Sequence, residues 1–442
     1  MRAPALARSP DAAPSRLRRI LGLGFGLAVI VGSTLGIGIL RAPGLVAGQI
    51  SNPSIILALW FVGGLYTLLG AVCLAELGTM LPAAGGYYVY ARRAFGDWVG
   101  FAVGWTDWLT YGAVLGYVSI AIGEFTAVLV PSLGGFVKVV AIASLVGLVA
   151  LQSAGVRVSA RFQEVTTALK FAAFLAVVIA ALLLAPAAST GSALPALAPS
   201  FVGIVIALQS VVITYGGWQS ALYFTEEDRD PNRNLPRSMI AGVASVIVVY
   251  LLVNVALLAV LPVPDLARST LPAADVAQIL VGDRGRQIIT VLSLVSLPPL
   301  LNAIMMIGTR ILFAMGRDGL LWKRTADVTA GGAPLAATLV TTAVAVALIA
   351  SGTFQKLVAI ASFFLVLNYS ICCLALVVLR RREPGLVRPF SAWGYPWSAA
   401  IVLAGAGAFL VGAAASDSVN AAAALALMAA GLAGRFVADR RS

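Results

Sequence analysis

The chain has 442 residues, of which 60% are hydrophobic and 11% are charged, and its mean hydropathy is +0.97. Soluble domains are roughly 45–50% apolar and about 25% charged, so this composition excludes a soluble globular protein. The sequence contains no histidine, which excludes histidine metal sites, histidine proton relays and Ser–His or Cys–His catalysis.

Apolar runs long enough to cross a bilayer, at about 20 residues each, follow one another along the chain. We identify twelve, near residues 20–48, 54–81, 98–129, 137–154, 160–185, 200–225, 238–262, 287–316, 334–351, 356–380, 396–415 and 418–437. The sequence therefore predicts an all-α polytopic membrane protein with twelve transmembrane helices. Residues 1–19, rich in Ala, Pro and Arg, are expected to form a cytoplasmic tail, because the run after them is too long for a signal peptide and lacks a convincing cleavage site.

The net charge of +12 has a topological explanation. If both termini are cytoplasmic, 23 of the 30 Lys and Arg residues face the cytoplasm, six face outside, and Lys170 lies within a span. This asymmetry follows the positive-inside rule. We therefore expect both termini in the cytoplasm, the lipid bilayer as the surroundings, and no nucleic-acid partner.

Glycines interrupt the first run where a membrane helix should be most regular. The sequence Gly36-Ile37-Gly38 predicts a break in the helix, since unpaired backbone groups are tolerated in a membrane only where they line a cavity or are buried in protein. The second half of such a helix presents free N–H groups and a positive dipole end, which suit a carboxylate. Carbonyls freed near Ser33 and Thr34 suit an ammonium group. The alternative is close helix packing, for which small residues are also used.

A second break is predicted in the sixth run. It comprises Ile213, Thr214, Tyr215, Gly216, Gly217 and Trp218. Carbonyls freed from the first two residues would be further acceptors for an amine. The two aromatic rings would wall the ligand, or alternatively pack within the bundle.

Five spans separate the two breaks, which indicates a repeat. An odd number of spans inverts the second copy, so we expect inverted repeats over 20–185 and 200–380 and two additional helices over 396–437. Paired breaks of this kind indicate the binding site of a transporter.

Four segments of the chain resemble a known family. They are VGSTLGIGILRAP (31–43), AELGTMLPAAGGYYVYARRAFG (75–96), TYGGWQSALYFTEEDRDPNRNLPRS (214–238) and RILFAMGRDGLL (310–321). The chain is similar to the amino acid–polyamine–organocation (APC) superfamily, above all to its L-type amino-acid transporter branch. The resemblance implies a LeuT-like fold with broken first and sixth helices and alternating access.

The resemblance also implies roles for residues at the breaks. Backbone amides of Gly36, Ile37 and Gly38 would hold the carboxylate of a substrate. Carbonyls near Thr34, Ile213 and Gly216 would hold its amine. The chain departs from the family at two of these positions. Ile37 replaces a common serine, and Ile213 replaces the usual aromatic lid.

Lys170 is the most informative single residue. It lies about 13 Å along the helix axis from Arg161, at ~1.5 Å per residue, and an ionisable group at such depth suggests function. The alternative is a lysine that snorkels to the interface. The resemblance implies that its ammonium occupies the sodium site of sodium-coupled relatives and bonds carbonyls of the first and eighth segments, so we expect transport without sodium.

Two acids are candidates for a pocket or gate. Asp107, in the third run, would favour cationic substrates if it faced the cavity, and the alternative is a buried, hydrogen-bonded acid. Glu76 is expected to be a structural or gating partner of a cytoplasmic arginine. The cysteines, Cys73, Cys372 and Cys373, all lie inside apolar runs, so no disulfide-linked heavy chain is expected.

These observations predict a secondary active transporter of the bacterial inner membrane. The expected substrates are neutral L-amino acids, carried by exchange or proton symport without sodium. One alternative is a polyamine or cationic amino-acid permease of the same fold, and another is a non-transporting amino-acid sensor. No motif for a metal, a cofactor or catalysis is present, so we expect no cofactor and no enzyme activity. The sequence predicts no particular oligomeric state.

Overall fold

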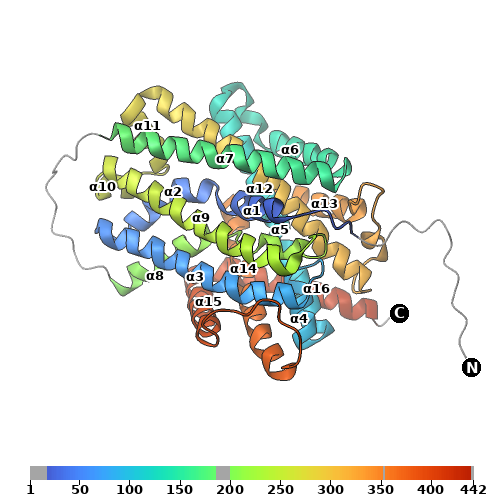
Figure 1. Ribbon diagram of the computed structural model, residues 1–442. Coiled ribbons are helices and arrows are strands. Elements are labelled where there is room, and N and C mark those ends of the chain that lie inside the picture. The colour runs from blue at the N-terminus through green and yellow to red at the C-terminus, as the bar shows by residue number, and fades with distance from the viewer. Residues whose placement is uncertain (1–16, 186–199, 352–353, 440–442) are drawn as a thin grey trace, which may run out of the picture.

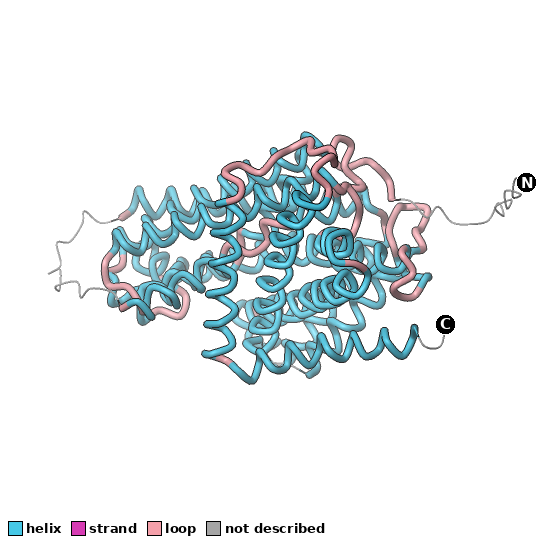
Figure 2. Tube along the Cα trace, turned by 90° about the horizontal axis from the view of Figure 1, so that it is seen from below, coloured by secondary structure: helices cyan, strands magenta, loops and turns pink. Residues whose placement is uncertain are grey.

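The computed structural model describes residues 17–185, 200–351 and 354–439, so most of the predicted 1–19 tail lies outside the described residues. The described chain is a bundle of helices, as the cyan tubes of Figure 2 show. The helices are α1 (Leu23–Thr34), α2 (Ile37–Ala47), α3 (Pro53–Met80), α4 (Tyr87–Phe95), α5 (Asp97–Leu129), η1 (Pro131–Phe136), α6 (Val137–Ser153), α7 (Val156–Leu184), α8 (Phe201–Thr214), η2 (Ser220–Phe224), α9 (Pro231–Val260), α10 (Val263–Arg268), α11 (Pro272–Val281), α12 (Asp283–Arg317), η3 (Lys323–Ala326), α13 (Leu335–Ser351), α14 (Phe354–Arg382), α15 (Trp397–Ser416) and α16 (Ser418–Asp439).

The protein is an all-helical, multi-span membrane protein. Within the described residues, nine helices are long and apolar enough to cross a bilayer, and the bent pair α1–α2 makes a tenth candidate. The predicted sixth and ninth spans correspond to the shorter apolar helices α8 and α13. Large apolar side chains such as Leu183, Phe201 and Val419 are exposed, as expected where the surrounding medium is lipid.

The bundle has two ends, which we name by the elements they carry (Figure 1). The terminal end carries α4 and the last turns of α16, and the distal end carries α10 and α11. Helix α3 begins with residues that are common at helix N-termini. At the distal end Asn52 accepts hydrogen bonds from the N–H groups of Ser54 and Ile55, and Pro53 is the first residue of α3.

Both glycine positions interrupt a helix. The axes of α1 and α2 meet at 44°, and Leu35 and Gly36 between them are extended. Helix α8 ends at Thr214 and is followed by a turn and then the short 3-10 helix η2. The second half of the sixth run is therefore a single tight turn of helix rather than an α-helical half.

Candidate functional site

A cavity of about 250 Å³ lies between the two breaks. Eight of the predicted site residues line it: Thr34, Gly36, Ile37, Gly38, Ile213, Thr214, Gly216 and Gly217. The facing wall comes from α5, α12 and α14. Its polar members are Thr110, Tyr111 and Tyr117 on α5 and Ser362 on α14, together with Gln219 and Ser220 from the chain after the second break.

The first break supplies hydrogen-bond donors. Helix α2 begins at Ile37, and its N-terminal Gly36 provides no side-chain cap, so the N–H groups of the first turn have no partner within the helix. A helix N-terminus of this kind suits an anionic group. Beside it, the hydroxyl of Thr34 is buried and has no hydrogen-bond partner among the described residues.

Backbone carbonyls of both breaks meet at Tyr250 on α9. Its hydroxyl lies 2.7 Å from the carbonyl oxygen of Thr34 and 2.9 Å from that of Thr214, and it donates its single proton to one of them at a time. The carbonyl of Ile213 accepts the N–H of Gly216 at 2.9 Å. Each carbonyl oxygen has two lone pairs, so acceptor capacity remains for an ammonium group.

Gly217 holds the two breaks in contact. Its φ is +116°, and a Cβ atom there would lie 2.7 to 2.9 Å from backbone atoms of Ser33 and Thr34. No side chain fits at that distance, and the backbone conformation itself disfavours one.

We expect Gly217→Ala to destabilise the protein by at least about 2 kcal/mol, since a strained conformation and an overlap each cost about 1–3 kcal/mol. Thermal unfolding in detergent measures the effect. The matched control is Gly36→Ala, because a Cβ there would meet only Leu300, at 3.8 Å. Equal melting temperatures for the two variants would contradict the prediction.

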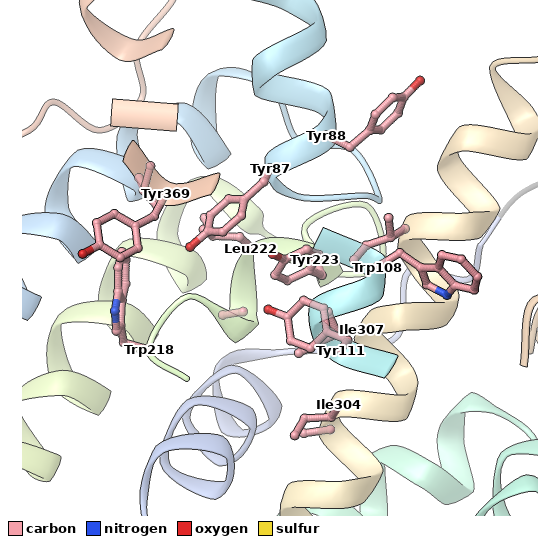
Figure 3. Close-up of a cluster of buried hydrophobic side chains, with 14 of the residues drawn as sticks. Tyr87, Tyr88, Trp108, Tyr111, Trp218, Leu222, Tyr223, Ile304, Ile307 and Tyr369 are labelled. Carbon is pink, nitrogen blue, oxygen red and sulfur yellow. The ribbon is translucent and has the colours of Figure 1, made fainter. Parts of the chain in front are cut away.

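Tyr215 and Trp218 do not line the cavity, contrary to the prediction. Tyr215 turns toward α3, where its hydroxyl donates to the carbonyl of Trp60 at 3.0 Å. Trp218 packs against Gly70 and lies beside Tyr369, with ring centroids 6.1 Å apart (Figure 3). Both rings pack within the bundle, which is the alternative that the sequence left open.

Lys170 on α7 is 0% exposed, which excludes snorkelling to the interface. Its ammonium donates to the carbonyl of Gly32 on α1 at 3.0 Å and to that of Ser296 on α12 at 2.9 Å. It does not line the cavity, but it fixes α1 just before the break. These two carbonyls belong to the first and eighth predicted segments, which are the two segments that the family resemblance implied as its partners.

Asp107 on α5 is buried and does not line the cavity. Its carboxylate accepts a hydrogen bond of 2.8 Å from the hydroxyl of Tyr223. The ring of Tyr111, which lines the cavity, lies edge-on to Tyr223 with centroids 5.4 Å apart (Figure 3). In this arrangement Asp107 is a buried, hydrogen-bonded acid that does not face a ligand in the cavity.

Glu76 lies at the terminal end of α3 and is fully buried. It accepts a hydrogen bond from Arg380 at 2.8 Å, lies 3.3 Å from the Nε of Arg388, and accepts the N–H of Ala392 at 2.7 Å. These contacts join α3 to α14 and to the chain that follows it. Glu76 is not among the residues that line the cavity.

A buried ion pair lies on the terminal side of the cavity. Arg310 and Glu227 are both 0% exposed and are joined by two hydrogen bonds of 2.8 and 3.1 Å. The backbone of Leu21 pairs with Glu227 and Arg229 at 3.0 Å. On the opposite side of the cavity, the exposed Arg41 belongs to the lining.

Comparison with known proteins finds a matching protein family and several similar proteins. A family model described as "Amino acid permease" matches residues 26–432. The chain is 27% identical to the serine/threonine exchanger SteT of Bacillus subtilis over 394 residues, which is 88% of this chain and 90% of the relative. It is 28% identical to the b(0,+)-type amino acid transporter 1 of Oryctolagus cuniculus, over 86% of this chain and 80% of the relative. It is also 28% identical to the Asc-type amino acid transporter 1 of Mus musculus, over 84% and 72% respectively.

Proposed function

Because the chain belongs to the amino acid permease family of the APC superfamily, which consists of transporters and not of enzymes, we propose that it carries neutral L-amino acids across a bacterial cytoplasmic membrane without sodium. We further propose twelve transmembrane helices in a LeuT-like arrangement, with inverted repeats over 20–185 and 200–380, two additional helices over 396–437 and both termini cytoplasmic. The 23-to-6 split of Lys and Arg supports that orientation.

The observation that carries this proposal is the cavity between the two breaks. The first residues of α2, whose N–H groups have no partner within the helix, and residues of both breaks line one space of about 250 Å³. An α-amino acid carries a carboxylate and an ammonium group on one carbon, so it matches both sets at once. By comparison, a cavity of about 150 Å³ accepts benzene, so this one has room for the amino acid backbone and a small side chain.

The charges of the lining favour a neutral substrate. Among the described lining residues Arg41 alone is charged, and Asp107 is not one of them. None of the described lining residues is Asp or Glu, so the lining offers no carboxylate to pair with the side chain of lysine or arginine or with a polyamine. This argues against the alternative of a polyamine or cationic amino-acid permease.

Lys170 supports sodium independence. Its ammonium already supplies a positive charge between the carbonyls of Gly32 and Ser296, and a sodium ion needs several oxygen ligands of this kind.

Exchange is the preferred mode over proton symport, because one of the similar proteins is named as an exchanger. With the terminal end in the cytoplasm, the buried Arg310–Glu227 pair lies on the cytoplasmic side of the cavity, and we propose that it keeps that side closed.

Uptake into liposomes that contain the purified protein tests the proposal. We expect uptake of one or more neutral amino acids, faster when the liposomes are preloaded with a neutral amino acid, and unchanged when choline replaces external sodium. Excess lysine or putrescine should not compete. Protein-free liposomes are the control.

Each part of the proposal has its own contrary result. Uptake that requires sodium overturns sodium independence, and preferred uptake of lysine or putrescine supports the alternative permease. A neutral amino acid that raises the melting temperature in detergent but is not taken up indicates a sensor. Uptake that follows an imposed proton gradient, with no effect of preloading, replaces exchange by proton symport.

A further inference from the structure

A second cavity, of about 140 Å³, lies between α7, α9, α11 and α12 in the distal half of the bundle. All the residues that line it are Leu, Val, Ile, Phe or Ala. It shares no lining residue with the cavity between the breaks. Without polar partners it cannot hold water or an amino acid in place, so its occupant must be apolar.

The cavity has a buried floor and a mouth on the outer surface of the bundle. Phe174 and Ala181 on α7 are buried at the floor, and so is Leu257 on α9. At the mouth, Leu184 is 53% exposed and Ile288 is 49% exposed. Both mouth residues belong to helices that are candidate membrane spans. The hydrocarbon of the bilayer is therefore the medium that meets this opening.

The size suits part of a hydrocarbon chain. Cavities of about 150 Å³ lined by Leu, Ile and Phe bind benzene, and a buried methylene group contributes about 0.8 kcal/mol by the same apolar burial. A lipid acyl chain has the same chemistry and is present at high concentration at the mouth.

A cation lies where the headgroup of such a lipid would be. Arg284 precedes Ile288 by four residues on α12, so it lies on the same helix face one turn nearer the distal end. Arg284 is exposed and makes no ion pair within the described ranges, whereas the nearby Arg286 is paired with Asp275 at 3.2 Å. Arginine binds phosphate oxygens through charge-assisted hydrogen bonds.

We propose that this cavity binds one acyl chain of an anionic phospholipid from the distal leaflet, with the lipid phosphate held by Arg284. The bound chain packs against Leu40 on α2, the second half of the broken first helix, and against Phe174, one turn beyond Lys170 on α7. The lipid thus lies against two helices that form or support the proposed substrate site. The inference goes beyond the proposed function and does not depend on it.

Photo-crosslinking tests the site. The purified protein is placed in liposomes of phosphatidylglycerol that carries a diazirine near the end of one acyl chain, irradiated, and mapped by mass spectrometry. We expect adducts concentrated on α7 and on the α11–α12 region. Ala181→Phe fills the cavity and should reduce these adducts at least fivefold, whereas the control Ala172→Phe, on an exposed position of the same helix outside the cavity, should not. Ala277→Phe, on the other wall, is a second filling variant should Ala181→Phe not fold.

The outcomes separate the possible occupants. Adducts spread evenly over the lipid-facing helices, or unchanged in a folded filling variant, overturn the acyl site. If no adducts form at this site, the acyl site is also overturned. That result is expected if another segment of the chain fills the cavity. Arg284→Gln should lower the adduct yield with phosphatidylglycerol, and an unchanged yield overturns the phosphate contact.

Discussion

Lys170→Met is expected to abolish transport while leaving a folded protein. Methionine keeps most of the length of the side chain but donates no hydrogen bond, so the carbonyls of Gly32 and Ser296 lose their donor. Hydrogen bonds to a charged group contribute about 1.5–3 kcal/mol each, which gives about 3–6 kcal/mol for fixing α1 beside its break. A change of that size alters the balance between two conformations more than a hundredfold, at about 1.4 kcal/mol per factor of ten.

The effect on stability should be smaller than the effect on transport. Removing the ammonium also removes the cost of burying a charge, which offsets part of the lost hydrogen bonding. Uptake into liposomes and thermal unfolding in detergent measure the two effects on the same preparation. The matched control is Lys138→Met on α6, where the lysine is exposed. Uptake by Lys170→Met at the rate of the unmodified protein would contradict the proposed role.

The features that could be predicted from sequence are local ones. Apolar length alone gives nine spans of the described chain, or ten with the bent pair α1–α2, and the glycines at 36, 38, 216 and 217 give both breaks, because each is a property of a few neighbouring residues. Lys170 stands out because it is a single charge in an apolar run. Gln163 and Thr167 precede it at helical spacing, and both donate to the carbonyl of Ala28 on α1. This polar stripe in the sequence indicates the face of α7 that contacts α1.

The rest of the site depends on contacts between residues far apart in the chain. Tyr250 is an ordinary tyrosine in an apolar run until the fold brings it to Thr34, 216 residues away. Asp107 is hidden from the cavity because the rings of Tyr111 and Tyr223 lie beside it, and no pattern in sequence predicts that shielding. Arg310 illustrates the limit of charge counting. The positive-inside rule places it with the cytoplasmic loop residues, yet the structure buries it with Glu227.

Breaking the Arg310–Glu227 pair is expected to have the second large effect. Both side chains are fully buried, and removing one partner of a buried ion pair costs about 3–5 kcal/mol, because the remaining charge is left without compensation. Arg310→Met and Glu227→Gln should each lower the free energy of unfolding by about that amount. The double variant should be more stable than the sum of the two losses predicts, since it buries no unpaired charge. Thermal or denaturant unfolding of the four proteins in detergent gives the coupling.

Loss of the Arg310–Glu227 pair should also open the terminal side of the cavity. Ser238 on α9 is buried against Gly26 on α1, and the three native cysteines are buried, so a cysteine introduced as Ser238→Cys reports opening through its reaction with a membrane-impermeant thiol reagent. We expect slow reaction in the otherwise unmodified protein and faster reaction when Arg310→Met is added. The control is Arg317→Met, whose partially exposed pair with Glu226 should contribute only about 0–1 kcal/mol. Equal losses of stability and equal reaction rates in the Arg310 and Arg317 variants would show that the buried pair does not hold the terminal side closed.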